Sequence, residues 1–384
     1  MSVYKYLLVA VALLTALPAV YADPDDGGKK EFTKRLKQSY ATSPRADVML
    51  ANRHGKIDVI TWDKAEVKID VTITVKAKTE AIAQKVFDRI TVEFDKKGNT
   101  VSAATVIQHR KDNDNTWWNG SSKGQHSQDY TIDYRVMMPS TNNLDVYNKY
   151  GDVVIPDLRG DLKASIKYGN ITGSDVKGET DLTLGHGKAR FANLQNVSGD
   201  VRYGHLTFDQ ALTVDLKSKH SVYRFERAKE IFADTKYDEF HVAAVSTLHS
   251  KGKYDEFHLG VVDKLTAQSQ YSTYEVARLA DDLDMNLRYG HFRVAEVVPT
   301  LASFDFEGDY TQVVLGMSES ASFDLDAEIT YGDMDAPRAL RPTQAKQVGF
   351  STNTYKGRMG KGNHDGKMKV RMKYGSLKIK DKKS

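Results

Sequence analysis

The hexapeptide KYDEFH occurs twice in this chain, at residues 236–241 and again at residues 253–258. The spacing between the two copies is 17 positions, and a similar spacing continues on both sides of them. Counted from the tyrosine of KYDEFH, a tyrosine or histidine recurs at intervals of 17 or 18 positions upstream and of 17 to 24 positions downstream. We call these thirteen positions the corner residues: Tyr150, Tyr168, His186, Tyr203, His220, Tyr237, Tyr254, Tyr271, Tyr289, Tyr310, Tyr331, Tyr355 and Tyr374.

Apolar residues alternate with polar ones on both sides of each corner residue. They follow it at three and five positions, as in Phe240 and Val242, and precede it at two and four positions, as in Ile166 and Ala164. This alternation is typical of strands with one buried face. The residue directly after the corner is usually glycine, which predicts an unusual backbone angle there. A further apolar ladder stands eight residues after the corner: Leu158, Val176, Leu194, Ala211, Ala228, Val245, Val262 and Leu279.

Each repeat therefore predicts a strand, a tight turn at the corner residue, a second strand and a short bend. One such unit cannot bury its apolar face alone, whereas a stack of units forms a continuous core. We predict a mainly β fold, a right-handed β-solenoid of 17–18-residue coils with parallel strands about 4.8 Å apart. Like residues would then lie over like, and the corner residues would form an aromatic ladder. The alternative is an antiparallel β meander.

The chain is predicted to have three parts. Residues 1–22 combine a short basic start, an apolar run and small residues at a cleavage position, which is typical of a secretory signal peptide. Residues 23–140 are predicted to form an N-terminal α+β cap region, which includes one isolated copy of the repeat at His54. Residues 141–384 are predicted to form the solenoid.

The pattern changes between the repeat at His54 and the next one. Ile82, Val86 and Ile90 share one face of a predicted short helix within TEAIAQKVFDRI. Such an insertion would cap the first coil, because an open solenoid end exposes strand edges and core. Residues 338–366 are less regular, which predicts an extended loop before a last coil at Tyr374. The strands expected in the insertion lie at residues 67–75, 91–94, 99–107 and 130–138.

Composition limits the classes of function. A net charge of +4 on 384 residues does not favour nucleic-acid binding, which needs a concentrated basic surface. After the N-terminal run no segment approaches 18 consecutive apolar residues, so no membrane span is expected. The chain has no cysteine, which excludes disulfides and thiolate metal ligands.

Several motifs together indicate a family. They are NRHGKIDV at 52–59 with a tryptophan three residues later, VKIDVTITV, YRVMMPS, LDVYNKYGDVVI at 144–155, and the serial YG turns behind a signal peptide. With these motifs the chain resembles the bacterial β-strand-repeat family labelled "putative adhesin", a domain of unknown function in exported proteins of Gram-negative bacteria. The resemblance implies export to the periplasm or cell surface and an adhesin-like role.

Two of the eleven histidines, His241 and His258, occupy the same position in adjacent repeats. Stacked coils would bring their rings about 5 Å apart, where both could bind one metal ion. The alternative is that they are exposed strand residues in a duplicated sequence. No carboxylate or thiolate stands beside them at an equally clear spacing, so we predict neither a metal site nor a cofactor.

A basic residue directly precedes the corner residue in eight of the thirteen repeats. In a solenoid these side chains point outward and form a column of like charges, which is mildly destabilising. The column is either a solvated face that discourages aggregation or an anion-binding stripe, for example for acidic polysaccharide. Its members are Lys149, Lys167, Arg202, Lys219, Lys236, Lys253, Arg288 and Lys373.

A polar stretch at residues 108–129 contains two adjacent tryptophans, Trp117 and Trp118. Binding residues are often carried on loops, and an exposed indole ring can stack on a sugar or enter a pocket of a partner protein. The alternative is that one or both rings fold back onto the body of the protein.

Sequence motifs of the common enzyme classes are missing, including the Walker loop, HExxH and GxSxG. We therefore predict a non-enzymatic binding or structural module that recognises a glycan or another envelope component. One alternative is a carbohydrate-active lyase or hydrolase with carboxylates paired across coils. Another is an envelope sensor or scaffold that binds a protein.

Overall fold

The computed structural model describes residues 28–108, 129–318, 320–336, 340–348, 351–359 and 366–381, without the side chains of residues 341–348. The chain forms two compact units, Met1–Gly178 and Glu179–Ser384. Two predictions fall outside the described residues, namely the signal peptide at residues 1–22 and the loop positions Trp117 and Trp118.

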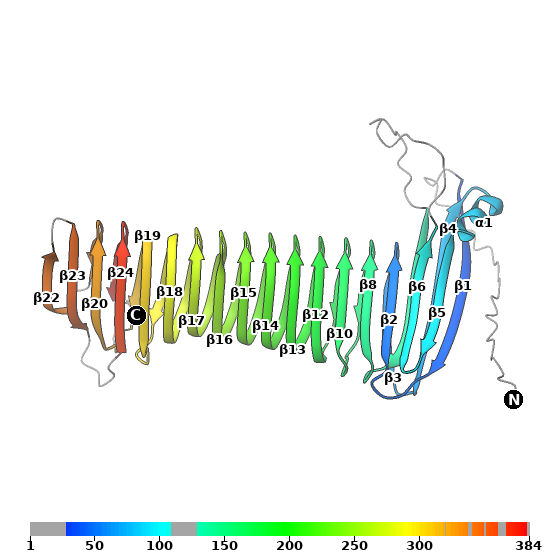
Figure 1. Ribbon diagram of the computed structural model, residues 1–384, viewed down its shortest axis with the longest axis horizontal. Helices are drawn as coiled ribbons and strands as arrows, with labels where there is room; N and C mark the ends of the chain where they lie inside the picture. Colours follow the sequence, from blue (N-terminus) through cyan, green and yellow to red (C-terminus); the bar gives the residue numbers. More distant parts are fainter. Residues whose placement is uncertain are drawn as a thin grey trace, which may run out of the picture. The chain divides into compact units, whose positions relative to one another are not determined.

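The first coil of the first unit consists of β2 and β3, with the corner at His54. It pairs in parallel with β8 and β9, the next repeat along the chain. In Figure 1 the blue strand labelled β2 accordingly lies beside the green β8. The elements of this unit are β1 (Lys30–Ala41), β2 (Asp47–Arg53), β3 (Ile57–Trp62), β4 (Glu66–Ala77), α1 (Glu80–Phe87), β5 (Ile90–Lys97), β6 (Thr100–Ile107), β7 (Tyr130–Pro139), β8 (Asn143–Lys149), β9 (Val153–Ile155), β10 (Leu162–Lys167) and β11 (Ile171–Gly173).

The inserted strands cover the other edge of this first coil. β6 pairs in parallel with β2, and β7 pairs in parallel with β3. Antiparallel strands continue from there, because β5 pairs with β6, β4 with β7, and β1 with β4. The strands expected at residues 67–75, 91–94, 99–107 and 130–138 are all present, with ends that differ by at most three residues.

The inserted helix α1 buries a different face from the predicted one. Thr79 caps its N-terminus by accepting a hydrogen bond from the backbone N–H of Ile82 at 3.3 Å. Ala83 and Phe87 are buried, whereas the Ile82 side chain is 48% exposed. The helix ends at Phe87, so Ile90 belongs to β5 and cannot extend a helical stripe.

The second unit contains most of the regular coils. Its elements are β12 (Val176–Gly185), which begins in the first unit, β13 (Lys188–Arg202), β14 (His205–Lys219), β15 (Val222–Lys236), β16 (Glu239–Lys253), β17 (Glu256–Gln270), β18 (Thr273–Val297), β19 (Ser303–Met317), β20 (Phe323–Thr330), β21 (Asp333–Asp335), β22 (Leu340–Val348), β23 (Thr352–Met359), β24 (Gly366–Lys373) and β25 (Ser376–Asp381).

Strands β13 to β17 have 15 residues each, and each makes most of one coil. Neighbouring strands pair in parallel at the spacing of the sequence repeat, so that Phe240 lies over Phe257. The ring centroids of Tyr237 and Tyr254 are 4.8 Å apart, and those of Tyr254 and Tyr271 are 4.9 Å apart. The predicted β-solenoid with its aromatic ladder is therefore confirmed, and the meander is wrong for these coils.

Stacked apolar columns fill the inside of the coils. In the second unit the ladder eight residues after each corner is buried, from Leu194 to Leu279. Three residues after the corner, Phe257 stacks between Phe240 at 4.7 Å and Tyr274 at 4.6 Å. The repeat in the sequence thus becomes a column of like side chains in the core.

The unusual backbone angle lies at the corner residue itself. The φ angles of Tyr203, Tyr237 and Tyr254 are 53°, 61° and 62°. This left-handed region costs a residue with a side chain roughly 1–2 kcal/mol. A stacked aromatic pair contributes about 0.5–1.5 kcal/mol, and the N–H of Tyr237 donates to the carbonyl oxygen of Lys253 at 3.1 Å. Stacking and this hydrogen bond between coils are together large enough to offset the strain.

Glycine follows the corner for a different reason from the predicted one. A Cβ atom on Gly151 would lie 1.9 Å from the carbonyl oxygen of Gly55, and one on Gly169 would lie 2.1 Å from that of Gly151. No atom fits at these distances. Glycine is needed there because adjacent coils approach closely, and the corner residue before it has the positive φ.

Four successive coils of the second unit replace this glycine with a buried polar residue, in the order Ser221, Asp238, Asp255 and Ser272. Each side chain accepts a hydrogen bond from the backbone N–H at the same position of the preceding coil, at 3.3, 2.6, 3.0 and 3.2 Å. Burial disfavours a charged carboxylate and raises the pKa of Asp238 to about 6 and that of Asp255 to about 7. We call these four residues the buried acid column.

The C-terminal repeat is inserted between two earlier repeats. The Tyr374 ring stacks on Tyr310 at 4.7 Å and on Tyr331 at 5.0 Å. β24 pairs in parallel with both β19 and β20, and in Figure 1 the red β24 lies between the yellow and orange strands. The predicted last coil exists, but its place in the stack differs from its place in the sequence.

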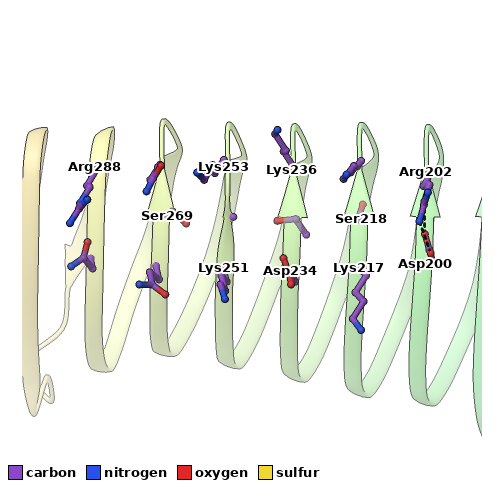
Figure 2. Close-up of a pocket in the computed structure, with 16 residues that line it drawn as sticks. Asp200, Arg202, Lys217, Ser218, Asp234, Lys236, Lys251, Lys253, Ser269 and Arg288 are labelled. Carbon is purple, nitrogen blue, oxygen red and sulfur yellow. Dashed lines mark hydrogen bonds and ion pairs between the residues drawn. The ribbon is translucent and has the colours of Figure 1, made fainter.

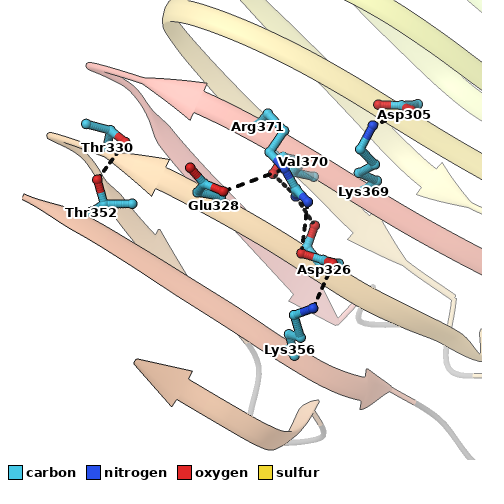
Figure 3. A network of polar contacts seen from close by, with 9 residues as sticks. All are labelled: Asp305, Asp326, Glu328, Thr330, Thr352, Lys356, Lys369, Val370 and Arg371. Atoms are coloured by element: carbon cyan, nitrogen blue, oxygen red, sulfur yellow. Dashed lines mark hydrogen bonds and ion pairs between the residues drawn. The ribbon is translucent and has the colours of Figure 1, made fainter. Parts of the chain in front are cut away.

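Charge alternation explains this insertion. The outward side chains of β19 and β20 are largely acidic, whereas those of β24 and β23 are largely basic. Lys369 pairs with Asp305 at 3.1 Å, and Arg371 and Lys356 both pair with Asp326 at 3.2 Å (Figure 3). Direct stacking of β20 on β19 would place the acidic side chains of one strand over those of the other, which is unfavourable. The basic strand between them removes that repulsion.

The prediction of an extended loop at residues 338–366 is wrong for the described part of that range. Leu340–Val348 and Thr352–Met359 form β22 and β23, which pair antiparallel with each other. β23 also pairs antiparallel with β20, with Tyr355 opposite Ala327. Tyr355 is therefore a strand residue and has no place in the aromatic ladder, because its spacing matched the repeat only by chance.

The stacked core gives a first testable prediction. Phe257→Ala removes a ring that is fully buried between two others, so it should lower the free energy of unfolding by about 3–5 kcal/mol. Glu226→Ala, at an exposed position of β15, two coils away, should change it by no more than about 0.5 kcal/mol. Urea denaturation of the three proteins measures both values, and equal losses in the two variants would contradict the assignment of inner and outer faces.

The buried acid column gives a second prediction. Between pH 4.5 and about pH 7 the folded chain retains a proton on Asp255 that the unfolded chain, with an aspartate pKa near 3.8, has lost. The bound proton stabilises the folded state at low pH. Its contribution to the free energy of unfolding is therefore lost as the pH rises through about 7. Asp255→Asn cannot ionise, so its stability relative to wild type should rise by roughly 2–4 kcal/mol over this range.

Denaturation of wild type and variant at the two pH values tests this expectation. The matched control is Asp234→Asn, which removes an exposed carboxylate from the adjacent strand segment. A constant difference between Asp255→Asn and wild type at both pH values would show that the carboxyl group does not exchange a proton on unfolding in this range.

Candidate functional site

A groove of about 790 Å³ lies along the strand segments that lead into the corner residues of β13 to β18. We call it the basic groove. Its walls are two outward columns, one directly before the corner residue and the other two residues earlier (Figure 2). The first column is Arg202, Lys219, Lys236, Lys253, Gln270 and Arg288, and the second is Asp200, Lys217, Asp234, Lys251, Gln268 and Asn286.

The parallel register brings the cations of the groove together. Lys219 is the register partner of Lys236, and Lys236 is the partner of Lys253. Strand alternation turns these side chains outward, while the residues between the two columns, such as Ser218 and Ser269, are buried and form the floor. Five of the sequence-predicted basic residues therefore line one surface of the second unit, with Arg202 and Arg288 at its ends.

The arginines at the ends of the groove form ion pairs, whereas the lysines between them form none with the Asp234 carboxylate that lies among them. Arg202 donates two hydrogen bonds to the Asp200 carboxylate at 2.9 and 3.0 Å, and Arg288 lies 3.6 Å from Asp309. Within the described residues, five lysines of the groove form no ion pair. They are Lys217, Lys219, Lys236, Lys251 and Lys253.

Aromatic and buried polar groups surround these cations. The Lys236 ammonium lies 5.0 Å from the centre of the Tyr237 ring, which is a cation–π contact. Beneath the groove, Asp255 accepts a hydrogen bond from the Thr235 hydroxyl at 3.0 Å, and the Tyr274 hydroxyl contacts Ser250 at 2.8 Å. Because burial raises the pKa of Asp255 to about 7, its carboxyl group does little to offset the lysines below neutral pH.

The other predicted basic residues lie elsewhere. Lys149 and Lys167 are register partners in the first unit, where the Lys149 ammonium lies 4.6 Å from the Tyr150 ring centre. Lys373 is the register partner of Asp309 on β19. These three residues do not line the basic groove, and Trp117 and Trp118 lie outside the described residues.

Sequence reasoning missed two groups of polar residues. Lys217 and Lys251 line the groove two positions before the predicted column, and the same alternation would have found them. Glu239 and Glu256 each stand two residues before His241 and His258, so carboxylates do lie beside these histidines at a regular spacing. The expectation that no carboxylate accompanies these histidines at a clear spacing, which argued against a metal site, is therefore wrong.

Paired carboxylates suited to hydrolysis are not found among the described residues of the groove. Asp238 and Asp255, whose pKa values are raised by burial, are each only 2% exposed, which prevents contact with a substrate. Among the described helices, none is long and apolar enough to cross a membrane.

Three solved structures resemble this chain over most of its length. They are a putative cell adhesion protein from Clostridium sporogenes (10% identity, 91% of this chain and 100% of that chain, TM-score 0.19), a putative adhesin from Bacteroides fragilis (9%, 90% and 97%, 0.23) and a putative lipid binding protein from Parabacteroides distasonis (12%, 90% and 96%, 0.23). These identities and TM-scores are too low to carry function from those proteins to this one.

No curated protein matches the sequence. The family model described as Toastrack DUF4097 matches residues 57–380, from the first coil to the last strand. This match agrees with the family resemblance of the repeat motifs and covers most of the chain. The protein therefore belongs to the Toastrack DUF4097 family.

Proposed function

We propose that this protein is an exported, non-enzymatic binding module of the bacterial envelope, and that its basic groove binds an extended polyanion such as an acidic polysaccharide. The observation that carries the proposal is the set of five groove lysines without ion-pair partners among the described residues. The signal-peptide pattern of residues 1–22 supports the export part of the proposal.

The repeat spacing favours a polymeric ligand over a small one. Like charges on register-paired residues destabilise a sheet, and Lys219, Lys236 and Lys253 repeat that arrangement over three coils. A small anion would offset one such contact, whereas a chain with regularly spaced carboxylates or sulfates would offset all of them. The groove is also open and runs across several coils, as a linear polymer requires.

The alternatives have less support from the described residues. A lyase or hydrolase needs accessible acid and base groups, and the carboxyl groups with raised pKa are buried. The core of a protein-binding surface is depleted of charged residues, lysine among them, whereas the walls of the basic groove are mostly charged or amide side chains. Trp117 and Trp118 are proposed as a second, salt-insensitive contact.

The groove gives a third prediction. Combined replacement of Lys219, Lys236 and Lys253 by Gln should weaken binding to acidic glycans roughly tenfold to a hundredfold, because three contacts of about 0.5–1 kcal/mol are lost. Wild-type binding should also weaken steeply at high salt, because screening acts over about 8 Å at physiological ionic strength. A glycan array at low and high salt, followed by titration of the best ligand, measures both effects.

A matched control separates the groove from general positive charge. Arg224, Lys229 and Arg278 are exposed on other faces of the second unit, so replacing all three by Gln makes the same change in net charge. This control should bind as wild type does. Equal losses in both triple variants, or no loss in either, would contradict a specific role of the groove, and salt-resistant binding that W117A/W118A abolishes would assign the contact to the tryptophans.

A further inference from the structure

A cluster of imidazole and carboxylate side chains lies on the strand segments that follow the corner residues, whereas the basic groove lies on the segments that precede them. It consists of Glu239 and His241 on β16, Glu256 and His258 on β17, and Glu275 on β18. We call it the His–Glu cluster. We propose that it binds a divalent transition-metal ion of the Zn²⁺ class.

The coil register assembles the cluster. Glu239 is paired with Glu256, His241 with His258, and His258 with Glu275. The two imidazole rings stack with centroids 4.9 Å apart and planes 15° from parallel. One ligand atom from each of Glu239, His241 and His258 lies within 4.8 Å of the other two. Residues from successive repeats are thus brought to the separation that a shared ion requires.

Each ring nitrogen of His258 contacts a different carboxylate. Its Nδ1 lies 3.3 Å from a Glu275 oxygen, and its Nε2 lies 3.0 Å from a Glu256 oxygen. If Nδ1–H donates to Glu275, Nε2 keeps its lone pair, as in carboxylate–histidine–metal arrangements. His241 likewise directs Nε2 toward Glu239. Two imidazole nitrogens and two carboxylates therefore meet on one surface.

The chemistry of these groups favours zinc-class ions over calcium or magnesium. Zn²⁺ takes four ligands from imidazole nitrogen and carboxylate oxygen at about 2.0–2.2 Å. Ca²⁺ and Mg²⁺ bind oxygen ligands, which makes two histidines unsuitable. The side chains of Glu239, His241, Glu256 and His258 are 33–56% exposed, so they have room to rotate to these bond lengths.

The metal ion also resolves a conflict within the cluster. Register pairing places the Glu239 carboxylate over that of Glu256, which is unfavourable without a cation between them. On the side of the preceding coil, Arg224 is the register partner of His241 and would repel a cation. The ion is therefore expected between β16 and β17, with Glu275 holding the His258 ring from β18.

Zinc titration of the chelator-treated protein tests the proposal. Isothermal calorimetry should detect a site in wild type that is missing from the double variant His241→Gln with His258→Gln. Zinc should also raise the melting temperature of wild type but not of the double variant, because a ligand stabilises the state that binds it. Glu275→Gln should retain the site with roughly 10-fold to 100-fold weaker affinity, since it loses the group that orients His258.

The control is His249→Gln, because His249 lies 3.7 Å from one carboxylate, that of Glu230, and stacks on Phe232 outside the cluster. This variant should bind zinc as wild type does, and all variants should melt as wild type does in chelator. The proposal is overturned if wild type shows no such site, if the double variant binds as many ions with the same affinity, or if the control loses as much binding as the double variant. In those cases the cluster is a set of ordinary surface ion pairs.

Discussion

In-register stacking of the coils is the constraint on which the rest of this structure depends. Each residue of a regular coil lies over the equivalent residue of the next repeat, so any side chain that recurs at this period becomes a column. Apolar columns fill the core, aromatic columns stack at the corner, and charged columns form the outer faces.

Two surfaces follow from the same rule. The basic groove arises from lysines directly before the corner, and the His–Glu cluster arises from the repeated EFH of KYDEFH.

The corner shows how the stack supports a backbone that would be unfavourable in isolation. A tyrosine or histidine with a positive φ is strained, and its ring has neighbours only when the next coil is in place. Glycine after the corner allows the close approach, and where four coils lack it, Ser221, Asp238, Asp255 and Ser272 replace steric fit with hydrogen bonds between coils. Local strain and long-range order are therefore coupled, which implies that coils form together with their neighbours and not one at a time.

Much of this fold follows from the sequence, because a repeat of near-constant period predicts both where the strands lie and the register in which adjacent coils pair. The corner ladder, the buried position eight residues later and the insertion after His54 were all predictable. The place of β24 was not predicted from spacing, since Tyr374 fits the end of the stack equally well; the acidic strands around Asp305 and Asp326 held the missing signal. Tyr355 was wrongly assigned to the ladder, because one residue at a suitable spacing does not define a coil.

The groove lysines were found by alternation, whereas Glu239 and Glu256 were overlooked beside the histidines. Residues such as Asp255, buried under the corner, cannot be recognised without knowledge of which coils pack closely.

The most direct test of in-register parallel stacking is the distance between two equivalent residues of adjacent repeats. The chain has no cysteine, so nitroxide spin labels can be attached to pairs of introduced cysteines without background. Asp234 and Lys251 are register partners on adjacent coils and both are exposed. A labelled D234C/K251C protein should therefore show strong dipolar broadening in its electron paramagnetic resonance spectrum, and a labelled D234C/H241C protein should show much less. Stronger broadening in the second pair, which would face each other across a hairpin at Tyr237, would contradict the solenoid.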